Sequence, residues 1–181
     1  MQTGSCIPDL QVIEPEVHVD ARGFFFESFN QRRFEESTGC ACRFVQDNHS
    51  CSTSHVLRGL HYQIQQPQGK LVRVVAGVVF DVAVDIRRSS PTFGKWAGMY
   101  LSEENKKIRW IPEGFAHGFL VMSERAELLY KTTNYWMPEC ERTIVWDDPD
   151  LAIDWPLNGA MPILSAKDRS APTFRKAEVF A

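Results

Sequence analysis

The stretch from Arg58 to Gly77, RGLHYQIQQPQGKLVRVVAG, brings together residue types that can do chemistry. Alternation along LRGLHYQ puts His61 and Gln63 on one face of an extended segment, and Lys70 begins the next apolar run. If both faces line one cavity, His61 and Lys70 project into it. A neutral imidazole can remove a proton next to a carbonyl group, and an ammonium group can stabilise the enolate oxygen that forms. The alternative is a hydrogen-bonded core histidine and a solvated lysine at a strand end.

Other polar residues lie in apolar surroundings elsewhere in the chain. FVQDNHS places Gln46, Asp47 and Asn48 directly after an apolar pair, and amides suit the hydroxyl groups of a sugar or the edge of a base. His117 follows small and aromatic residues in IPEGFAHGF, and Tyr130 ends the apolar run of ELLYKTT. Each has a plain alternative, as a loop, a capping histidine or a core-edge tyrosine. Their joint presence favours a polar cavity.

A metal centre is not expected in this cavity. Metal-binding cupin barrels typically carry two histidines one residue apart, followed by a glutamate. Here His61 is followed by Tyr62 and Gln63, and QIQQPQG contains no glutamate. Zinc or iron needs three or four close ligands. Only His61 and His117 are candidate metal ligands here.

Strand-like segments are the dominant pattern in the sequence. The alternating or apolar segments are residues 10–20, 23–29, 70–76, 77–87, 95–102, 107–112, 117–123, 126–133 and 142–148. Turn sequences such as SSPTFG and PEGFA separate them. Short helices are predicted at residues 30–37, capped by Asn30, and near SAKDRS, capped by Ser165. Many strands with few helices indicate a β-sandwich or barrel.

Size and composition indicate an ordinary globular protein. The chain has 181 residues, which suits a single domain, with a short helix and tail expected from about residue 160 to 181. Apolar residues make up 44% and charged residues 24%. The net charge of −3 gives no reason to expect a nucleic-acid or membrane partner. We find no apolar run long enough to span a membrane and no secretory signal.

The cysteines are expected to be free thiols. There are five, an odd number, and none forms a C-x-x-C pair. Free thiols are typical of the cytoplasm. The CAC sequence at Cys40 to Cys42 is interpreted as a loop with two unremarkable thiols.

Two acidic residues in VFDVAVDIR have an open interpretation. Asp81 and Asp85 share a face of the predicted strand with Ala83. They are either partners of residues in the site or charges that face solvent, and the sequence does not choose between these.

Several motifs occur together in one order along the chain. They are RGFFFESFN, FVQDNHS, VLRGLHYQ, QGKLVRVVAGVVFDVAVDIRRSSPTFGKW, IPEGFAHGF, YKTTNYW and LSAKDR. In order and spacing they closely resemble the dTDP-4-dehydrorhamnose 3,5-epimerase family, from about residue 7 to 170. The resemblance implies an all-β, cupin-like jelly-roll barrel that contains no metal and works as a homodimer. It also implies a dTDP-4-keto-6-deoxy sugar as the substrate, inverted at C3 and C5. The C4 ketone acidifies both neighbouring C–H bonds, so no redox cofactor is expected.

The resemblance also assigns the catalytic residues. His61 is the base, and Asp168 pairs with it and stabilises the imidazolium that forms. Tyr130 is the acid on the opposite face of the sugar, at least for C5. Its ordinary pKa near 10 keeps it protonated at neutral pH. Lys70 stabilises the enolate at the C4 oxygen.

Binding residues follow from the same motifs. The resemblance places them at the nucleotide, the diphosphate and the sugar, and it gives Trp136 the position of an aromatic residue stacked on thymine. The segment with Arg22 and Glu27 is expected to reach the partner subunit. His18, His49 and His55 are assumed to be surface or loop residues. The full set of binding residues is Arg22, Phe25, Glu27, Gln46, Asp47, Asn48, Arg58, Lys70, His117, Trp136, Glu141 and Lys167.

Two other functions stay open at this point. One is an epimerase that inverts only C3 or C5 in another dTDP-deoxysugar pathway, on the same scaffold. The other is a cupin that is not an epimerase, either metal-dependent or a sugar-binding module.

Overall fold

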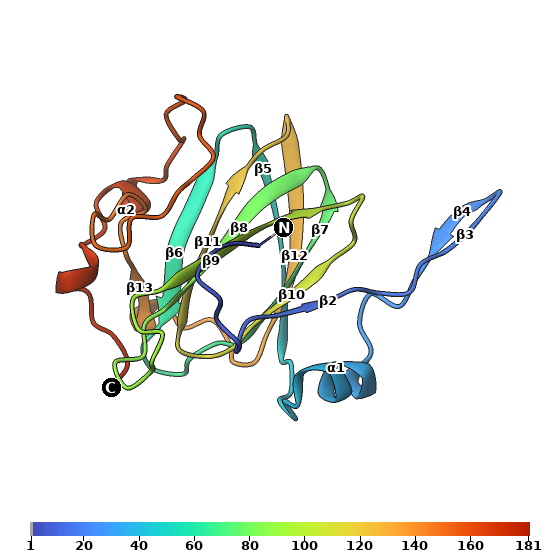
Figure 1. Cartoon of the computed structure of the whole chain (residues 1–181), viewed down its shortest axis with the longest axis horizontal. Coiled ribbons are helices and arrows are strands. Elements are labelled where there is room, and N and C mark those ends of the chain that lie inside the picture. Colours follow the sequence, from blue (N-terminus) through green and yellow to red (C-terminus); the bar gives the residue numbers. More distant parts are fainter. Residues whose placement is uncertain (1) are drawn as a thin grey trace.

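The computed structural model describes residues 2–181, which fold around a β-sandwich (Figure 1). Its strands are β1 (Gln2–Gly4), β2 (Gln11–Ile13), β3 (His18–Asp20), β4 (Gly23–Phe25), β5 (Gln46–Thr53), β6 (Leu57–Gln63), β7 (Lys70–Ala76), β8 (Val78–Asp85), β9 (Trp96–Ser102), β10 (Ile108–Ile111), β11 (Phe115–Val121), β12 (Arg125–Thr132) and β13 (Glu141–Thr143). The helices are α1 (Gln31–Thr38) and α2 (Ala166–Arg169), with 3₁₀ turns at Pro138–Cys140 and Phe174–Lys176.

Residues 2–181 form two large antiparallel sheets and one separate hairpin. The first sheet has the strand order β1-β9-β8-β11-β6-β13, and the second has the order β2-β10-β7-β12-β5. The all-β jelly roll expected from the sequence is confirmed. The two sheets face each other as a sandwich and do not close into one barrel.

The space between the sheets contains an apolar region and a polar one. Val72 and Leu128 of the second sheet meet Val79, Ala83 and other apolar residues of the first. This packing excludes water and fixes the distance between the sheets. The polar side chains of the site occupy the remaining interior.

The C-terminal segment covers the outer face of the first sheet. Phe80, Val82 and Val84 of β8 pack there against Leu151 and Trp155. Both faces of β8 are therefore buried, which explains its nearly continuous apolar sequence. Helix α2 belongs to this segment and lies on the left of Figure 1.

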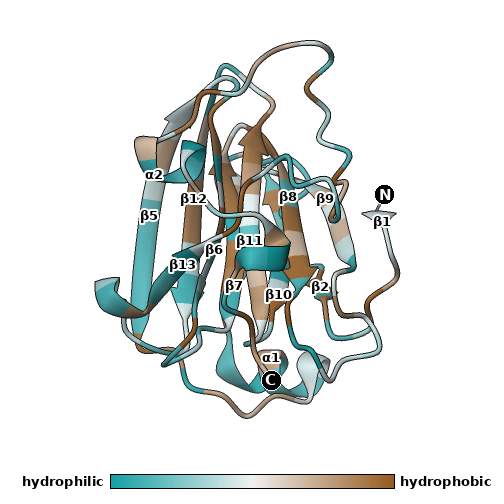
Figure 2. Ribbon diagram, turned by 90° about the vertical axis from the view of Figure 1, so that its left-hand side faces the viewer, coloured by the Kyte–Doolittle hydropathy of each residue, from teal (hydrophilic) through white to brown (hydrophobic). Residues whose placement is uncertain are grey.

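Helix α1 covers part of the outer face of the second sheet. Its buried Phe34 packs against Leu71 and Trp110. The predicted Asn30 cap is confirmed, because its side chain accepts a hydrogen bond from the backbone N–H of Arg33. In Figure 2 the central strand β8 is largely brown, whereas β5 at the edge of the second sheet is largely teal.

The predicted break between two strands at Ala76–Gly77 is also confirmed, since β7 ends at Ala76 and β8 begins at Val78. Gly77 has a positive φ of 75°. A Cβ atom there would lie 2.0 Å from the carbonyl oxygen of Arg125, so only glycine fits this turn.

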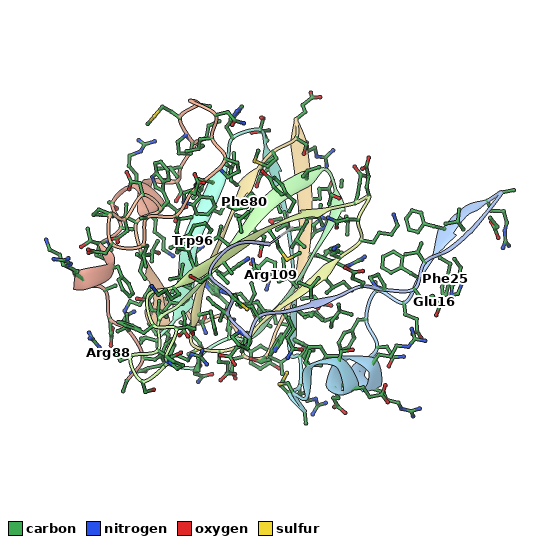
Figure 3. All side chains as sticks on the ribbon, in the orientation of Figure 1. Glu16, Phe25, Phe80, Arg88, Trp96 and Arg109 are labelled. Atoms are coloured by element: carbon green, nitrogen blue, oxygen red, sulfur yellow. The ribbon has the colours of Figure 1, made fainter. Side chains whose placement is uncertain are left out.

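Strands β3 and β4 form a hairpin that projects away from the sandwich (Figure 1). Val19, Phe24 and Phe25 on this hairpin are 76%, 62% and 68% exposed. Phe25 is labelled in Figure 3 on the projecting arm. Large apolar side chains at this exposure mark a surface that another molecule can cover.

Candidate active site

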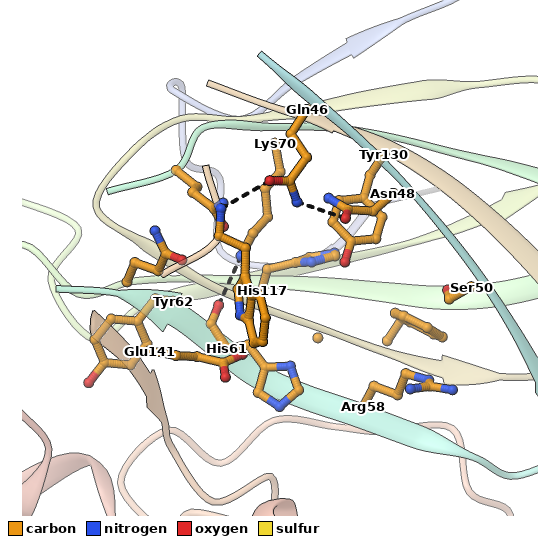
Figure 4. A pocket seen from close by; sticks show the side chains of 15 residues that line it. Gln46, Asn48, Ser50, Arg58, His61, Tyr62, Lys70, His117, Tyr130 and Glu141 are labelled. Carbon is orange, nitrogen blue, oxygen red and sulfur yellow. Dashed lines mark hydrogen bonds between the residues drawn. The ribbon is translucent and has the colours of Figure 1, made fainter. Parts of the chain in front are cut away.

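A pocket of about 360 Å³ opens between the two sheets. Strands of both sheets supply its walls, as Figure 4 shows. We call it the central pocket. Its lining residues are Gln46, Asn48, Ser50, Arg58, His61, Tyr62, Gln63, Gln68, Lys70, His117, Gly118, Phe119, Tyr130, Trp136 and Glu141.

His61 lies on β6, in the first sheet, and pairs with Asp168 of α2. The distance from its Nε2 to Asp168 Oδ1 is 2.5 Å. Burial alone would raise the pKa of Asp168, but the hydrogen bond and charge of His61 outweigh burial and hold that pKa below its usual value. An ionised carboxylate only accepts hydrogen bonds, so Nε2 carries a hydrogen. In the neutral ring, Nδ1 is left as the basic nitrogen.

The local sequence explains the position of Asp168. The Ser165 side chain accepts a hydrogen bond from the Asp168 backbone N–H, as the predicted cap requires. Asp168 is thereby held in the first turn of α2, where a carboxylate is favoured. Its side chain is almost completely buried against His61.

Lys70 is the first residue of β7 and lies in the opposite sheet from His61. Its side chain is buried, and Nζ donates to the backbone oxygen of His61 over 3.1 Å. Burial lowers the pKa of Lys70 from 10.5 to about 8, although the negative charges of Glu141 and Asp81 oppose that effect. Lys70 is therefore a mostly protonated cation at neutral pH, held in an interior that solvates it poorly.

Tyr130 lies on β12, also in the second sheet. It packs against the apolar core and lines the central pocket. Burial raises the pKa of Tyr130, so the phenol stays protonated at neutral pH. His61 and Tyr130 thus approach the pocket from opposite sheets.

His117 belongs to a buried charged group that sequence reasoning found only in part. Its Nε2 lies 2.6 Å from Asp81 Oδ2, and Arg109 donates to Asp81 Oδ1 over 2.8 Å. Arg109 also donates to the backbone oxygens of Asp81 and Ala97. It reaches from β10 in the second sheet to β8 in the first, and Figure 3 shows it inside the sandwich.

The acid of this group and its histidine both have shifted pKa values. Burial alone would raise the pKa of Asp81, but the charges and hydrogen bonds of His117 and Arg109 hold it below its usual value. Burial lowers the pKa of His117, against the attraction of Asp81. The lowered pKa of Asp81 indicates an ionised carboxylate between Arg109 and His117.

The open interpretation of Asp81 and Asp85 is settled by burial, since both are 0% exposed. Asp81 is a partner of His117 at the pocket. Asp85 instead binds Arg87, Ser90 and Thr92 at the end of β8. The solvent-facing alternative is wrong for both, because the second sheet or neighbouring loops cover that face.

Most of the predicted binding residues line the central pocket, but Asp47 does not. Gln46 and Asn48 face the pocket, and Gln46 donates to Asn48 over 2.9 Å. Asp47 points to the opposite side of β5 and pairs with Lys131 over 2.9 Å. This follows from strand alternation, which puts neighbours on opposite faces.

Arg22, Phe25 and Glu27 lie outside the central pocket of their own chain. Arg22 pairs with Asp20 on the projecting hairpin, and Glu27 pairs with Arg33 at the start of α1. Lys167 also lies outside the lining, but its Nζ is 2.5 Å from Glu141, which is part of it.

Strand β5 is not recognisable as a strand from the sequence, so some pocket residues on it were not predicted. The strand is polar at nearly every position, so no apolar alternation marks it. Ser50, which has a buried hydroxyl with no hydrogen-bond partner, lines the pocket from β5. Gln68, Phe119 and Arg109 were also missed. Arg109 could have been found as a charged residue between two apolar ones in a short strand.

Other expectations concern residues away from the pocket. His18, His49 and His55 are exposed, as assumed. All five cysteines are free. Within residues 2–181, no cluster of three or more His, Cys, Asp or Glu is arranged to hold a metal ion. No helix in that range is long and apolar enough to cross a membrane.

The profile of the dTDP-4-dehydrorhamnose 3,5-epimerase family matches residues 5–176. The chain belongs to this family. It is 64% identical to the dTDP-4-dehydrorhamnose 3,5-epimerase of Pseudomonas aeruginosa, over 98% of both chains.

Solved structures of the epimerase family superimpose closely on this fold. The dTDP-6-deoxy-D-glucose-3,5-epimerase of Legionella pneumophila, solved in complex with dTDP-4-keto-L-rhamnose, matches with a TM-score of 0.93 and 55% identity. That match covers 98% of this chain and 95% of the other. A 3'-monoepimerase of Streptomyces bikiniensis, in complex with dTDP-quinovose, has a TM-score of 0.86 and 34% identity, covering 92% and 84%.

Proposed function

We propose that this protein converts dTDP-4-dehydro-6-deoxy-D-glucose into dTDP-4-dehydro-L-rhamnose by inverting C3 and C5. One observation carries the proposal. His61, which is paired with Asp168, and Tyr130 enter one pocket from opposite sheets. Lys70 lines the same pocket. Inversion needs a proton acceptor and a proton donor on opposite faces of a sugar ring, and this arrangement supplies both.

The base in this mechanism is His61. Its Nδ1 removes the proton from the carbon next to the C4 ketone. The C–H electrons form a double bond to C4, and the carbonyl π electrons move onto the C4 oxygen to give an enolate. Asp168 orients the ring through Nε2 and stabilises the imidazolium. Almost complete burial of Asp168 keeps water from competing for that hydrogen bond.

The enolate oxygen needs a cation, and Lys70 supplies it. A buried ammonium group acts more strongly than one in water because the surroundings screen it less. Tyr130 then donates its proton to the opposite face of the same carbon, which inverts the centre. The C4 ketone re-forms as the carbon takes this proton. Before a second inversion, His61 releases the proton it removed to solvent and the phenolate regains one.

The nucleotide occupies the outer part of the pocket. The exposed Trp136 stacks on the thymine, and the amides of Gln46 and Asn48 lie beside it. The Arg58 guanidinium, held by Ser52 over 2.9 Å, faces the diphosphate. His117 and the Glu141–Lys167 pair complete the binding surface.

A second copy of the chain completes the site in this proposal. The β3–β4 hairpin exposes aromatic residues, which are typical of the core of an interface. It also carries Arg22 and Phe25, which do not line the pocket of their own chain. In a homodimer the hairpin reaches the nucleotide in the partner's pocket. Glu27, which comes just after the hairpin in the sequence, lies at the same interface. We further propose that the chain works as one domain, in the cytoplasm, without a cofactor.

The decisive experiment is proton NMR of the dTDP-4-keto sugar with the protein in heavy water. Deuterium at both C3 and C5 supports the proposed double inversion. His61→Ala is expected to abolish exchange, and Tyr130→Phe is expected to abolish inversion at C5. Normal turnover in His61→Ala would contradict the assigned base.

The 3'-monoepimerase among the similar structures gives a reason to keep a second candidate function. Deuterium at one carbon only, in the same NMR experiment, would identify a single-site epimerase. Nucleotide-sugar binding without any exchange would exclude both epimerase functions.

A further inference from the structure

Glutamine side chains hold the loop that carries Trp136. Gln63 Oε1 accepts a hydrogen bond from the Met137 backbone N–H over 2.8 Å. Its Nε2 donates to the backbone oxygens of Gln66 and Tyr135, over 2.8 and 3.2 Å. One buried amide therefore binds the main chain on both sides of the tryptophan.

Two more glutamines bind the same loop. Gln46 Oε1 accepts from the Trp136 backbone N–H over 3.0 Å. Gln68 Nε2 donates to the backbone oxygen of Asn134 over 2.8 Å. Each of the four consecutive residues 134–137 thus has a main-chain hydrogen bond to a glutamine side chain. We call these contacts the glutamine clamp.

Packing covers the Trp136 residue only in part. The residue is 55% exposed, so the direction of the indole depends on the backbone that carries it. Gln63, in contrast, is only 2% exposed. Both of its N–H groups already donate to backbone oxygens, so it has no free donor for a ligand.

We propose that Gln63 is a positioning residue that pre-organises Trp136 for a nucleobase. The inference rests on the proposed function, in which Trp136 stacks on the base. A loop that is already ordered loses less entropy when the ligand binds, which raises affinity without a new contact. Gln63 thus acts on the binding of base-containing ligands and leaves proton transfer at the sugar unchanged.

Gln63→Met tests this directly, because methionine has a similar volume but cannot make the hydrogen bonds. Calorimetric titration is expected to show dTDP binding weakened roughly five- to tenfold, as for the loss of one or two hydrogen bonds. KM is expected to rise with kcat unchanged. Inorganic pyrophosphate has no base, so its inhibition constant is expected to stay at the wild-type value.

A matched control is Gln11→Met. Gln11 on β2 also donates to a backbone oxygen, that of Thr38, but lies outside the pocket lining. This variant is expected to bind dTDP like the wild type. If Gln63→Met does not fold, Gln68→Met removes only the hydrogen bond to the Asn134 backbone oxygen, and a smaller rise in KM with kcat unchanged is expected.

A double-mutant cycle separates positioning from general destabilisation. In a Trp136→Ala background, Gln63→Met is expected to cause no further loss of dTDP affinity. The same loss in both backgrounds, weaker pyrophosphate binding, or a fall in kcat at constant KM would each overturn the inference. A wild-type protein that does not bind dTDP would instead overturn the proposed function.

Discussion

Replacing Lys70 by methionine is expected to make the protein more stable and almost inactive. Burial lowers the pKa of Lys70 from 10.5 to about 8. Each pKa unit corresponds to about 1.4 kcal/mol, so carrying this charge at pH 7 costs the folded state about 3 kcal/mol. Methionine removes that cost but leaves the His61 backbone oxygen without its donor, which costs about 1 kcal/mol. The net gain in the free energy of unfolding is about 2 kcal/mol.

The size of this effect depends on pH in a defined way. Below pH 8 the lysine is protonated in both the folded and the unfolded state, so the full cost is present. Between pH 8 and pH 10.5 the folded state has lost the proton while the unfolded state still holds it, and the cost disappears. In urea unfolding at fixed protein concentration, the free energy of unfolding of Lys70→Met is expected to be higher than that of the wild type at pH 7 and equal to it at pH 10.

Activity is expected to move in the opposite direction. Removal of one group that stabilises a developing oxyanion lowers kcat by about 10²- to 10³-fold, and Lys70→Met is expected to fall in this range. In the wild type, kcat/KM is expected to decline above pH 8 as Lys70 loses its proton. The reasoning is refuted if Lys70→Met is less stable than the wild type at pH 7, or if the stability gap is the same at both pH values.

Three further substitutions test other parts of the site. Asp168→Asn is expected to lower kcat by about 10²-fold or more, because His61 no longer keeps its hydrogen on Nε2, and KM is expected to stay unchanged in steady-state assays. The control is Asp150→Asn, which changes a surface ion pair. Arg109→Met leaves Asp81 without its buried cation and is expected to cost about 3–5 kcal/mol in urea unfolding; a loss below 1 kcal/mol would refute the assigned pairing. Phe25→Ser is expected to shift the protein from dimer to monomer in light scattering and to weaken dTDP binding, whereas an unchanged dimer contradicts the role of the hairpin.

Strand positions were predictable where apolar alternation was strong, and not elsewhere. The β7–β8 pair and both helix caps are visible in the sequence, because apolar runs, a glycine and capping residues are local signals. Strand β5 was missed because its inward face is polar, as the wall of a binding pocket must be.

The site itself was predictable in its residue types but less in its contacts. Pairing of Asp168 with His61 joins residues 107 positions apart and was expected only from the family resemblance. The sequence does not indicate that Arg109 on β10 pairs with Asp81 on β8, because the two residues are far apart along the chain. The direction of Asp47 needed the register of β5, which the sequence did not provide.

The sandwich explains why proton transfer takes place between the sheets. Neighbouring side chains on one face of a sheet point the same way, so one sheet alone cannot supply a base and an acid to opposite faces of a sugar ring. Here β6 supplies His61 and β12 supplies Tyr130, and the apolar core beside them fixes the distance between the sheets. The same interior must then hold buried charges, which is costly unless they are paired. Arg109 and Asp81 pair across the two sheets, so the contact that neutralises the interior also ties together the two walls of the site.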